Sequence, residues 1–171
     1  KRIASSSEID HLLGEEGNGW YQSTKTLNNE RLVNAATCLG MLDAVLEDAV
    51  DHMKTRHAFG KPIGQFQALQ HYIADIAMWQ KQGELLFLHT ATLQANDIDS
   101  AMESNMAKVF CSEAVGKAAD LGIQILGGMG YSAETDMQRY WRDSRLLRIG
   151  PVSNDMARNM IAESFGLPRS F

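Results

Sequence analysis

Three long stretches of the chain repeat their apolar residues every three or four positions, and this periodicity restricts the fold more than any other feature. The spacing is typical of an amphipathic α-helix with one buried stripe. The first stretch begins near Tyr21 and ends near His57, because Gly60 can adopt a left-handed cap and Pro62 cannot continue the helical hydrogen-bond ladder. Its stripe consists of Leu32, Ala35, Ala36, Leu39, Leu42, Leu46, Ala49, Val50 and Met53.

The second stretch begins after Pro62 or Gly64 and ends at the turn formed by Asn96 and Asp97. Its stripe consists of Phe66, Leu69, Ile73, Ile76, Ala77, Leu86 and Leu93.

The third stretch begins at Ser100, which is spaced with Glu103 as a capping box, and ends at the glycines of residues 127–130. Two shorter helices are expected near residues 133–140 and 153–165. Helices with one apolar face, joined by short connections, must bury those faces against one another. The sequence therefore predicts an all-α fold, an antiparallel up-down helical bundle.

The composition argues against several classes of protein. Lysine and arginine number 16 against 21 acidic residues, and they form no block, which argues against a nucleic-acid surface. Charges and amides interrupt every apolar run, so no membrane span is expected. Cys38 and Cys111 lie in apolar helical patterns, which favours buried free thiols in a reducing, cytoplasmic setting.

Helical bundles often hold di-iron sites, which need paired Glu-x-x-His motifs that face inward. Glu8 and His11 form the one such motif, and it lies outside the expected bundle. The sequence therefore predicts no metal site.

Two segments between helices carry residues suited to a phosphate-bearing cofactor. The first runs from Arg56 through Phe59 and Gly60 to Gln67, and the second covers Gln124 to Tyr131. An arginine can hold a phosphate with two parallel hydrogen bonds, an aromatic ring can shield the cofactor from water, and glycine allows close approach of the backbone. Taken alone, each segment can equally be an ordinary helix cap or turn.

Together the two segments resemble the C-terminal helical domain of the acyl-CoA dehydrogenase family. Residues 12–20, Leu-Leu-Gly-Glu-Glu-Gly-Asn-Gly-Trp, look like the passage from that family's middle β-domain, and residues 142–145, Arg-Asp-Ser-Arg, precede the last helix as they do there. The resemblance implies that residues 1–20 are a lead-in from a missing middle β-domain and that residues 21–171 are the C-terminal helical bundle domain.

The resemblance also implies a cofactor and partners. In this family FAD lies between subunits of a homotetramer. The resemblance therefore implies that this chain forms a homotetramer or a homodimer. By resemblance, one subunit would contact FAD through Arg56, Phe59 and Gln67, and the neighbour would meet its adenosine-diphosphate part through Gln124, Gly127 and Gly128. The implied substrate is an acyl-CoA thioester, and the implied electron acceptor is an electron-transfer flavoprotein.

The sequence departs from the family pattern at the usual catalytic base. Many members carry a glutamate in a Glu-Gly-Thr motif, where this chain has Pro151, Val152 and Ser153. Proline cannot accept a proton, so that base is absent. The hydroxyl of Ser153 matches the threonine that faces FAD in the family, and Asp155 stands where an amide or acid is common.

Other members, long-chain and branched-chain dehydrogenases among them, place the base on the first long helix, immediately before an arginine. Glu30 and Arg31 match that arrangement. A carboxylate can act as such a base when substrate binding removes water from it. Arg31 would hold the CoA portion near the base, with Asn28 reaching the same group; the alternatives are a solvated glutamate and a surface ion pair.

Two functions from different classes follow from these residues. The first is an FAD-dependent acyl-CoA dehydrogenase with Glu30 as the base that removes the α-proton, although this chain alone is expected to be inactive. The alternative is a non-catalytic, family-like subunit that serves assembly or binding in a heteromer. Pro151 favours the second function, and Glu30 favours the first.

Overall fold

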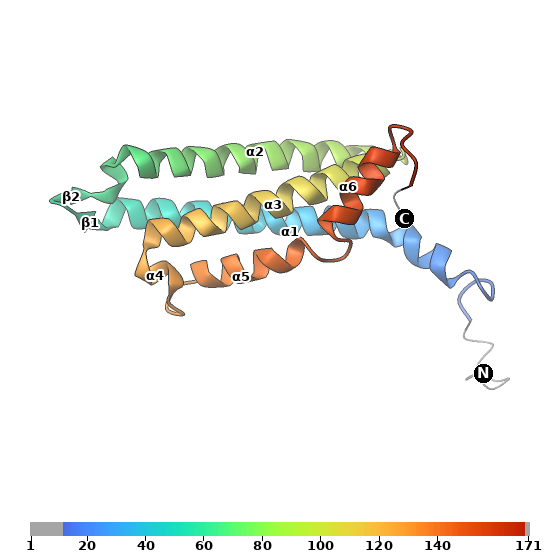
Figure 1. The fold of residues 1–171 in the computed structure, drawn as a ribbon, viewed down its shortest axis with the longest axis horizontal. Coiled ribbons are helices and arrows are strands. Elements are labelled where there is room, and N and C mark those ends of the chain that lie inside the picture. Colours follow the sequence, from blue (N-terminus) through green and yellow to red (C-terminus); the bar gives the residue numbers. More distant parts are fainter. Residues whose placement is uncertain (1–11, 170–171) are drawn as a thin grey trace.

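The computed structural model describes residues 12–169, so the motif formed by Glu8 and His11 lies outside the described residues. Three long helices, α1 (Gly19–Thr55), α2 (Gln67–Ala95) and α3 (Ala101–Leu126), lie side by side and alternate in direction (Figure 1). The prediction of an all-α, antiparallel up-down bundle is confirmed. Within the described residues, no helix is both long enough and apolar enough to span a membrane.

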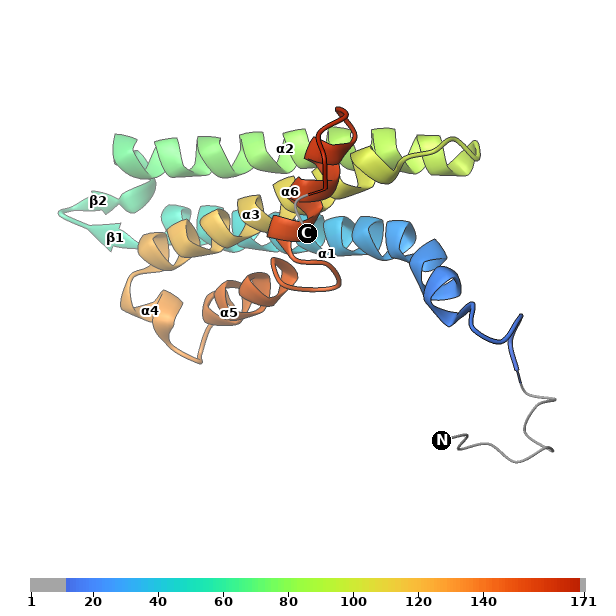
Figure 2. The same cartoon turned by 45° about the vertical axis from the view of Figure 1, so that its right-hand side comes forward.

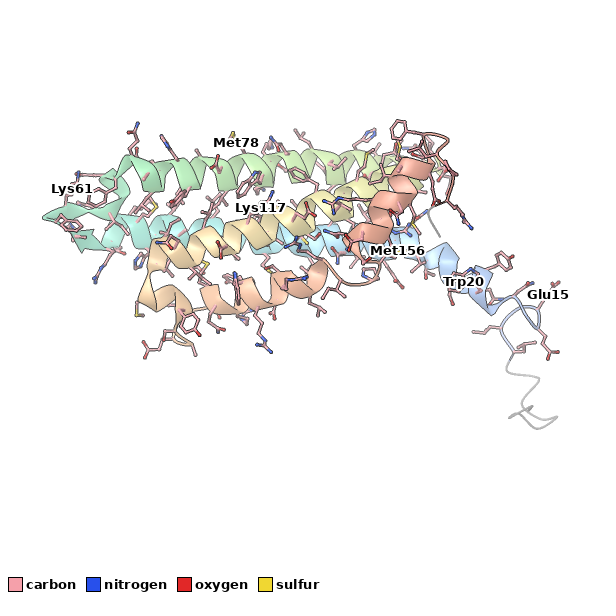
Figure 3. The ribbon with its side chains drawn as sticks, viewed as in Figure 1. Glu15, Trp20, Lys61, Met78, Lys117 and Met156 are labelled. Carbon is pink, nitrogen blue, oxygen red and sulfur yellow. The ribbon has the colours of Figure 1, made fainter. Side chains whose placement is uncertain are left out.

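Three shorter helices complete the bundle. They are α4 (Gly128–Tyr131), α5 (Met137–Leu147) and α6 (Asn154–Glu163). Helix α5 runs beside α3 and α1, and α6 crosses α3 near the opposite end from the hairpin (Figures 1 and 2). The first turns of α1 extend beyond the bundle, where Trp20 is exposed (Figure 3).

The core lies where α1, α2, α3 and α5 meet. Small and β-branched residues of α3 allow close approach of its neighbours, and Met137 of α5 fills the space above Gly122. The fully buried side chains include Cys38 and Cys111, which are free thiols as the sequence predicts. Burial raises the pKa of the Cys111 thiol to about 12, so the thiol stays protonated at neutral pH.

A short hairpin that the periodicity did not predict joins α1 to α2. Strands β1 (His57–Ala58) and β2 (Lys61–Pro62) pair in antiparallel register, and a 3₁₀ turn, η2 (Ile63–Gln65), leads into α2. Gly60 adopts a φ of +79°, but it does so in the two-residue turn of the hairpin rather than as the cap of α1. Phe59 also has a positive φ, of +52°, because a two-residue type I′ turn requires a positive φ at both of its central residues.

The capping box expected at Ser100 does not form. The Ser100 side chain makes no capping hydrogen bond, and the carboxylate of Asp99 accepts one from the Ala101 amide instead, at 3.1 Å. Either oxygen can satisfy a free amide in the first turn, and here the acidic residue next to Ser100 reaches it.

Candidate functional site

Glu30 and Pro151 line one groove, although they lie 121 residues apart in the sequence (151 − 30). The groove has a volume of about 410 Å³, and its lining is largely apolar. Glu30 is exposed on α1, and Pro151 lies in the connection between α5 and α6. The remaining lining residues are Thr26, Asn29, Val33, Asn34, Thr37 and Leu147. We call this the α1 groove.

Arg31 points away from the α1 groove and into the contact between α1 and α6. Only 5% of its surface is exposed. Its Nη1 donates a hydrogen bond to Oδ1 of Asn28 at 2.7 Å, and its Nη2 lies 3.4 Å from the sulfur of Met160. Burial lowers the pKa of Arg31, and the charge of Glu30 opposes that shift. Among the described residues, the Nε of Arg31 is buried without a hydrogen-bond partner.

Ser153 begins the last helix. Its hydroxyl accepts a hydrogen bond from the amide of Met156 at 3.2 Å, which is the usual role of a serine at this position. Asp155 is exposed in the first turn of α6. Neither residue lines the α1 groove, although both follow Pro151 within four residues in the sequence.

A second groove brings the two predicted cofactor segments together at the other end of the bundle. Arg56, Gly127 and Gly128 line it, and its volume is about 520 Å³. The other lining residues are His52, Ile63, Ile125, Leu126 and Met129. We call this the arginine groove. One chain thus places both segments at the same end of the bundle, and the division of Arg56 and the two glycines between neighbouring subunits, which the resemblance implies, stays a prediction.

The arginine groove has the chemistry that a phosphate-bearing cofactor requires. Within the described part of the chain, Arg56 forms no ion pair, so its guanidinium is available to an anion. A Cβ atom added at Gly127 or Gly128 would meet nothing within 4 Å. Gly127 also has a φ of +61°, which a residue with a side chain rarely adopts. These residues therefore fit a diphosphate that approaches the backbone closely.

The other predicted cofactor residues lie near this end of the bundle but do not line the arginine groove. Phe59 is 94% exposed at the tip of the hairpin, with its ring edge-on to Phe66. Gln67 is exposed at the start of α2, and Gln124 is exposed in the last turn of α3. Met129 also lines the arginine groove.

His52 is a lining residue that the sequence reasoning missed. It lies in the last turn of α1, four residues before Arg56, and both residues line the groove. Burial lowers the pKa of His52, and the charge of Arg56 lowers it further. The four-residue spacing from Arg56 was the available signal.

A buried lysine that the sequence reasoning also missed fixes the start of α6. Lys108 of α3 is fully buried, and its Nζ donates a hydrogen bond to Oδ1 of Asn154 at 2.6 Å. The hydroxyl of Ser112 exchanges hydrogen bonds with the same amide, at 3.2 Å to its oxygen and 3.0 Å from its nitrogen. Burial lowers the pKa of Lys108 to about 8. This network fixes the end of the segment that carries Pro151.

The two grooves are far apart within one chain. Glu30 lies on α1 and Arg56 directly follows the last residue of this helix. At about 1.5 Å per residue they are separated by roughly 39 Å along the helix. No cluster of three or more histidine, cysteine, aspartate or glutamate side chains suited to a metal ion occurs among residues 12–169.

Comparisons with known proteins identify the family of the chain. Residues 17–166 match the family model described as "Acyl-CoA dehydrogenase, C-terminal domain". The chain is 39% identical over 153 residues to the mitochondrial short-chain specific acyl-CoA dehydrogenase of Rattus norvegicus, a match that covers 90% of this chain and 37% of the rat protein.

Solved structures show the same fold. The crystal structure of an acyl-CoA dehydrogenase from Geobacillus kaustophilus superposes with a TM-score of 0.89 at 30% identity, over 91% of this chain and 41% of that one. An FAD complex of PigA superposes with a TM-score of 0.86 at 28% identity, over 91% and 40%. The chain thus spans about two fifths of the length of these relatives. By the match to its C-terminal domain, the chain belongs to the acyl-CoA dehydrogenase family.

Proposed function

We propose that the chain is the helical part of an FAD-dependent acyl-CoA dehydrogenase in which Glu30 removes the α-proton of an acyl-CoA thioester. The single observation that carries this proposal is that Glu30 and Pro151 line the same groove. By resemblance, position 151 holds the base in many members of the family. A carboxylate on α1 that faces the same space is therefore a direct replacement for the missing one.

The chemistry of the reaction balances with one base and one hydride acceptor. The Glu30 carboxylate takes the α-proton as the Cα–H bond breaks, and the electron pair of that bond forms the new double bond. FAD, when bound, supplies the acceptor for the hydride that leaves the β-carbon. The product is a 2,3-enoyl thioester, and the electrons then pass to an electron-transfer flavoprotein.

The residues around Glu30 suit the substrate. The largely apolar surface of the α1 groove suits an acyl chain, and a bound thioester would remove water from the exposed Glu30 carboxylate, which makes proton transfer easier. Arg31 follows Glu30 directly in the sequence, and the Nε of its buried guanidinium has no hydrogen-bond partner among the described residues. With Asn28, it is proposed to bind the CoA portion of the thioester.

The arginine groove is proposed to bind the diphosphate of FAD. Its distance of roughly 39 Å from Glu30 favours a flavin that is shared between two chains, with the α1 groove of one chain and the arginine groove of another. Arg56, Gly127 and Gly128 would then meet the diphosphate from a single subunit. Phe59, Gln67 and Gln124 would contact the cofactor from around that groove, and Ser153 and Asp155 from the first turn of α6.

The test uses the full-length protein reconstituted with FAD and measures the anaerobic loss of flavin absorbance with a panel of acyl-CoA thioesters. We expect rapid bleaching in the wild type and a loss of about 10²- to 10⁴-fold in rate in Glu30→Gln, with flavin still bound. Glu47→Gln, an exposed glutamate of the same helix, is the matched control and should bleach as the wild type does.

A rescue experiment tests the shared groove directly. In the double variant Glu30→Gln/Pro151→Glu, the carboxylate moves to the other side of the α1 groove, so part of the bleaching rate should return. Equal bleaching in the wild type and Glu30→Gln would mean that the base lies elsewhere. Absence of bleaching with every thioester in all variants would favour the non-catalytic subunit, which is the function that Pro151 itself suggests.

A further inference from the structure

Asn34 joins the helix of Glu30 to the connection that carries Pro151. It lies one helical turn after Glu30 on α1, and only 7% of its surface is exposed. Its Nδ2 donates hydrogen bonds to two backbone carbonyls, that of Leu147 at 3.3 Å and that of Gly150 at 3.0 Å. One side chain of α1 therefore holds both the end of α5 and the residue just before Pro151.

The orientation of the Asn34 amide is determined by its surroundings. Two carbonyl oxygens face one end of the amide, so that end must be the NH₂ group, which has two donors. The Oδ1 at the other end faces the thiol of Cys38 at 3.7 Å, which can donate to it. Each end of the amide thus has partners of the right kind, and the side chain is fixed in place.

A separate set of contacts holds the far end of the same connection. The backbone N–H of Asn154 donates a hydrogen bond to the carbonyl of Arg148 at 3.0 Å, which closes the loop. Lys108 and Ser112 hold the side chain of Asn154 against α3. These contacts fix the loop relative to α3. Asn34 is the residue that fixes it relative to α1, where Glu30 lies.

A buried amide is not needed for the packing of α1. Asn34 is next to Ala35 and one turn before Cys38, both fully buried in the apolar core. An apolar residue would fill this position without the cost of removing an amide from water. The amide is therefore best explained by its two carbonyl partners and by the groove that it lines with Glu30.

We infer that Asn34 is a positioning residue for the dehydrogenation. By holding the carbonyls of Leu147 and Gly150, it sets the width of the α1 groove between Glu30 and Pro151, and so the distance from the base to the α-carbon of the thioester. This inference rests on the proposed function. It adds a residue that acts through the loop and does not touch the reacting atoms.

The experiment uses the full-length, FAD-loaded protein and compares the wild type with Asn34→Ala and Asn34→Leu. Asn34→Leu removes both donors at similar side-chain volume, so a cavity does not explain its effect. Thr90→Val is the matched control, because Thr90 is also buried and its hydroxyl donates a hydrogen bond within α2, to the carbonyl of Leu86 at 2.8 Å. Two quantities are measured, the limiting rate of flavin bleaching and the hydrogen exchange of residues 148–154.

For both Asn34 variants we expect faster hydrogen exchange in residues 148–154 and a fall of about tenfold to a hundredfold in the limiting bleaching rate, with flavin content unchanged. Thr90→Val should leave both quantities at the wild-type values. Unchanged exchange in 148–154, or bleaching no slower than in Thr90→Val, would overturn the inference even if the wild type is an active dehydrogenase. If the wild type itself fails to bleach, the proposed function fails, and the exchange of residues 148–154 still decides whether Asn34 holds the loop.

Discussion

At the scale of single residues, the burial of Lys108 makes the stability of the protein depend on pH. Its pKa is lowered to about 8 because it is buried, from an ordinary value of 10.5. Between these two values the unfolded chain binds more protons than the folded chain at this residue, so the contribution of Lys108 to stability rises as pH increases from about 8 toward 10.5. Below pH 8 the cost of the buried charge is fully present.

We expect Lys108→Met to be stabilised, relative to the wild type, more at pH 7.5 than at pH 9.5. The free energy of unfolding of the two proteins should converge by about 2 kcal/mol over that range. Lys117→Met, at an exposed lysine of the same helix, should show no such convergence. Burial raises the pKa of the Cys38 and Cys111 thiols, which gives the opposite pH dependence, but this contribution is common to all variants and cancels in the differences. A constant difference between wild type and Lys108→Met would contradict the prediction.

The sequence alone did not reveal Lys108, and the reason is physical. A lysine in an amphipathic helix is normally placed on the solvated face, and burial is possible here because Asn154, 46 residues later, supplies an oxygen. The face of α3 on which Lys108 lies could be recognised from the sequence. Ser104, Lys108 and Ser112 recur every four residues and are all buried, so a polar buried stripe was present in the pattern. The partner of this stripe on α6, Asn154, could not be recognised from the sequence.

At the scale of elements, Gly128 and Gly130 of α4 differ in the space around them. A Cβ atom at Gly130 would lie 2.8 Å from the Cα of Ile123 and 2.9 Å from its carbonyl oxygen, which are backbone atoms that cannot move aside cheaply. Gly130→Ala should therefore lower the free energy of unfolding by about 1 to 3 kcal/mol. Gly128→Ala adds its methyl group to open space and should leave the stability nearly unchanged.

Chemical unfolding of the two variants tests the first half of this prediction, and flavin content of the full-length protein tests the second. Gly128→Ala should lose FAD while remaining folded, because the methyl group would enter the arginine groove. Equal stability of Gly130→Ala and Gly128→Ala would contradict the assignment. The sequence identified these glycines as a group, but it gave no means to divide them, since the division depends on the approach of α4 to Ile123.

The long helices and α6 were predictable, whereas the hairpin and the Ser100 cap were not. The apolar periodicity located α1, α2 and α3 within a few residues of their ends, because each stripe repeats over many turns. The hairpin of β1 and β2 has two residues in each strand, too few for any periodicity, and its turn contains Phe59 in a conformation that favours glycine. The Ser100 capping box failed for a similar reason, since a neighbouring carboxylate competes for the same amide.

At the scale of the whole molecule, the up-down topology explains where the two grooves lie. Helices α1 and α3 run in the same direction, so Arg56 at the end of α1 and Gly127 at the end of α3 reach the same end of the bundle (Figure 1). Helix α5 runs in the opposite direction, so the connection after it returns to the part of α1 that carries Glu30. The bundle prediction already contained this geometry. Which subunit supplies Arg56 and which supplies the glycines to one FAD stays a prediction.

The same topology leaves an apolar face on α2 that a second copy of the chain can cover. Met78, Leu85 and Leu88 are spaced to lie on one side of the helix, and each is more than half exposed. Met78 lies on the side of α2 that faces away from the other helices (Figure 3).

We therefore expect the 171-residue chain to self-associate, and we expect Leu85→Glu to weaken that association by placing a charge in the contact. Leu167→Glu, at an exposed leucine near the end of the chain, is the control. Sedimentation velocity at several concentrations measures the effect: a shift toward monomer in Leu85→Glu alone fits a contact through α2, whereas a monomeric wild type would show that this face stays uncovered.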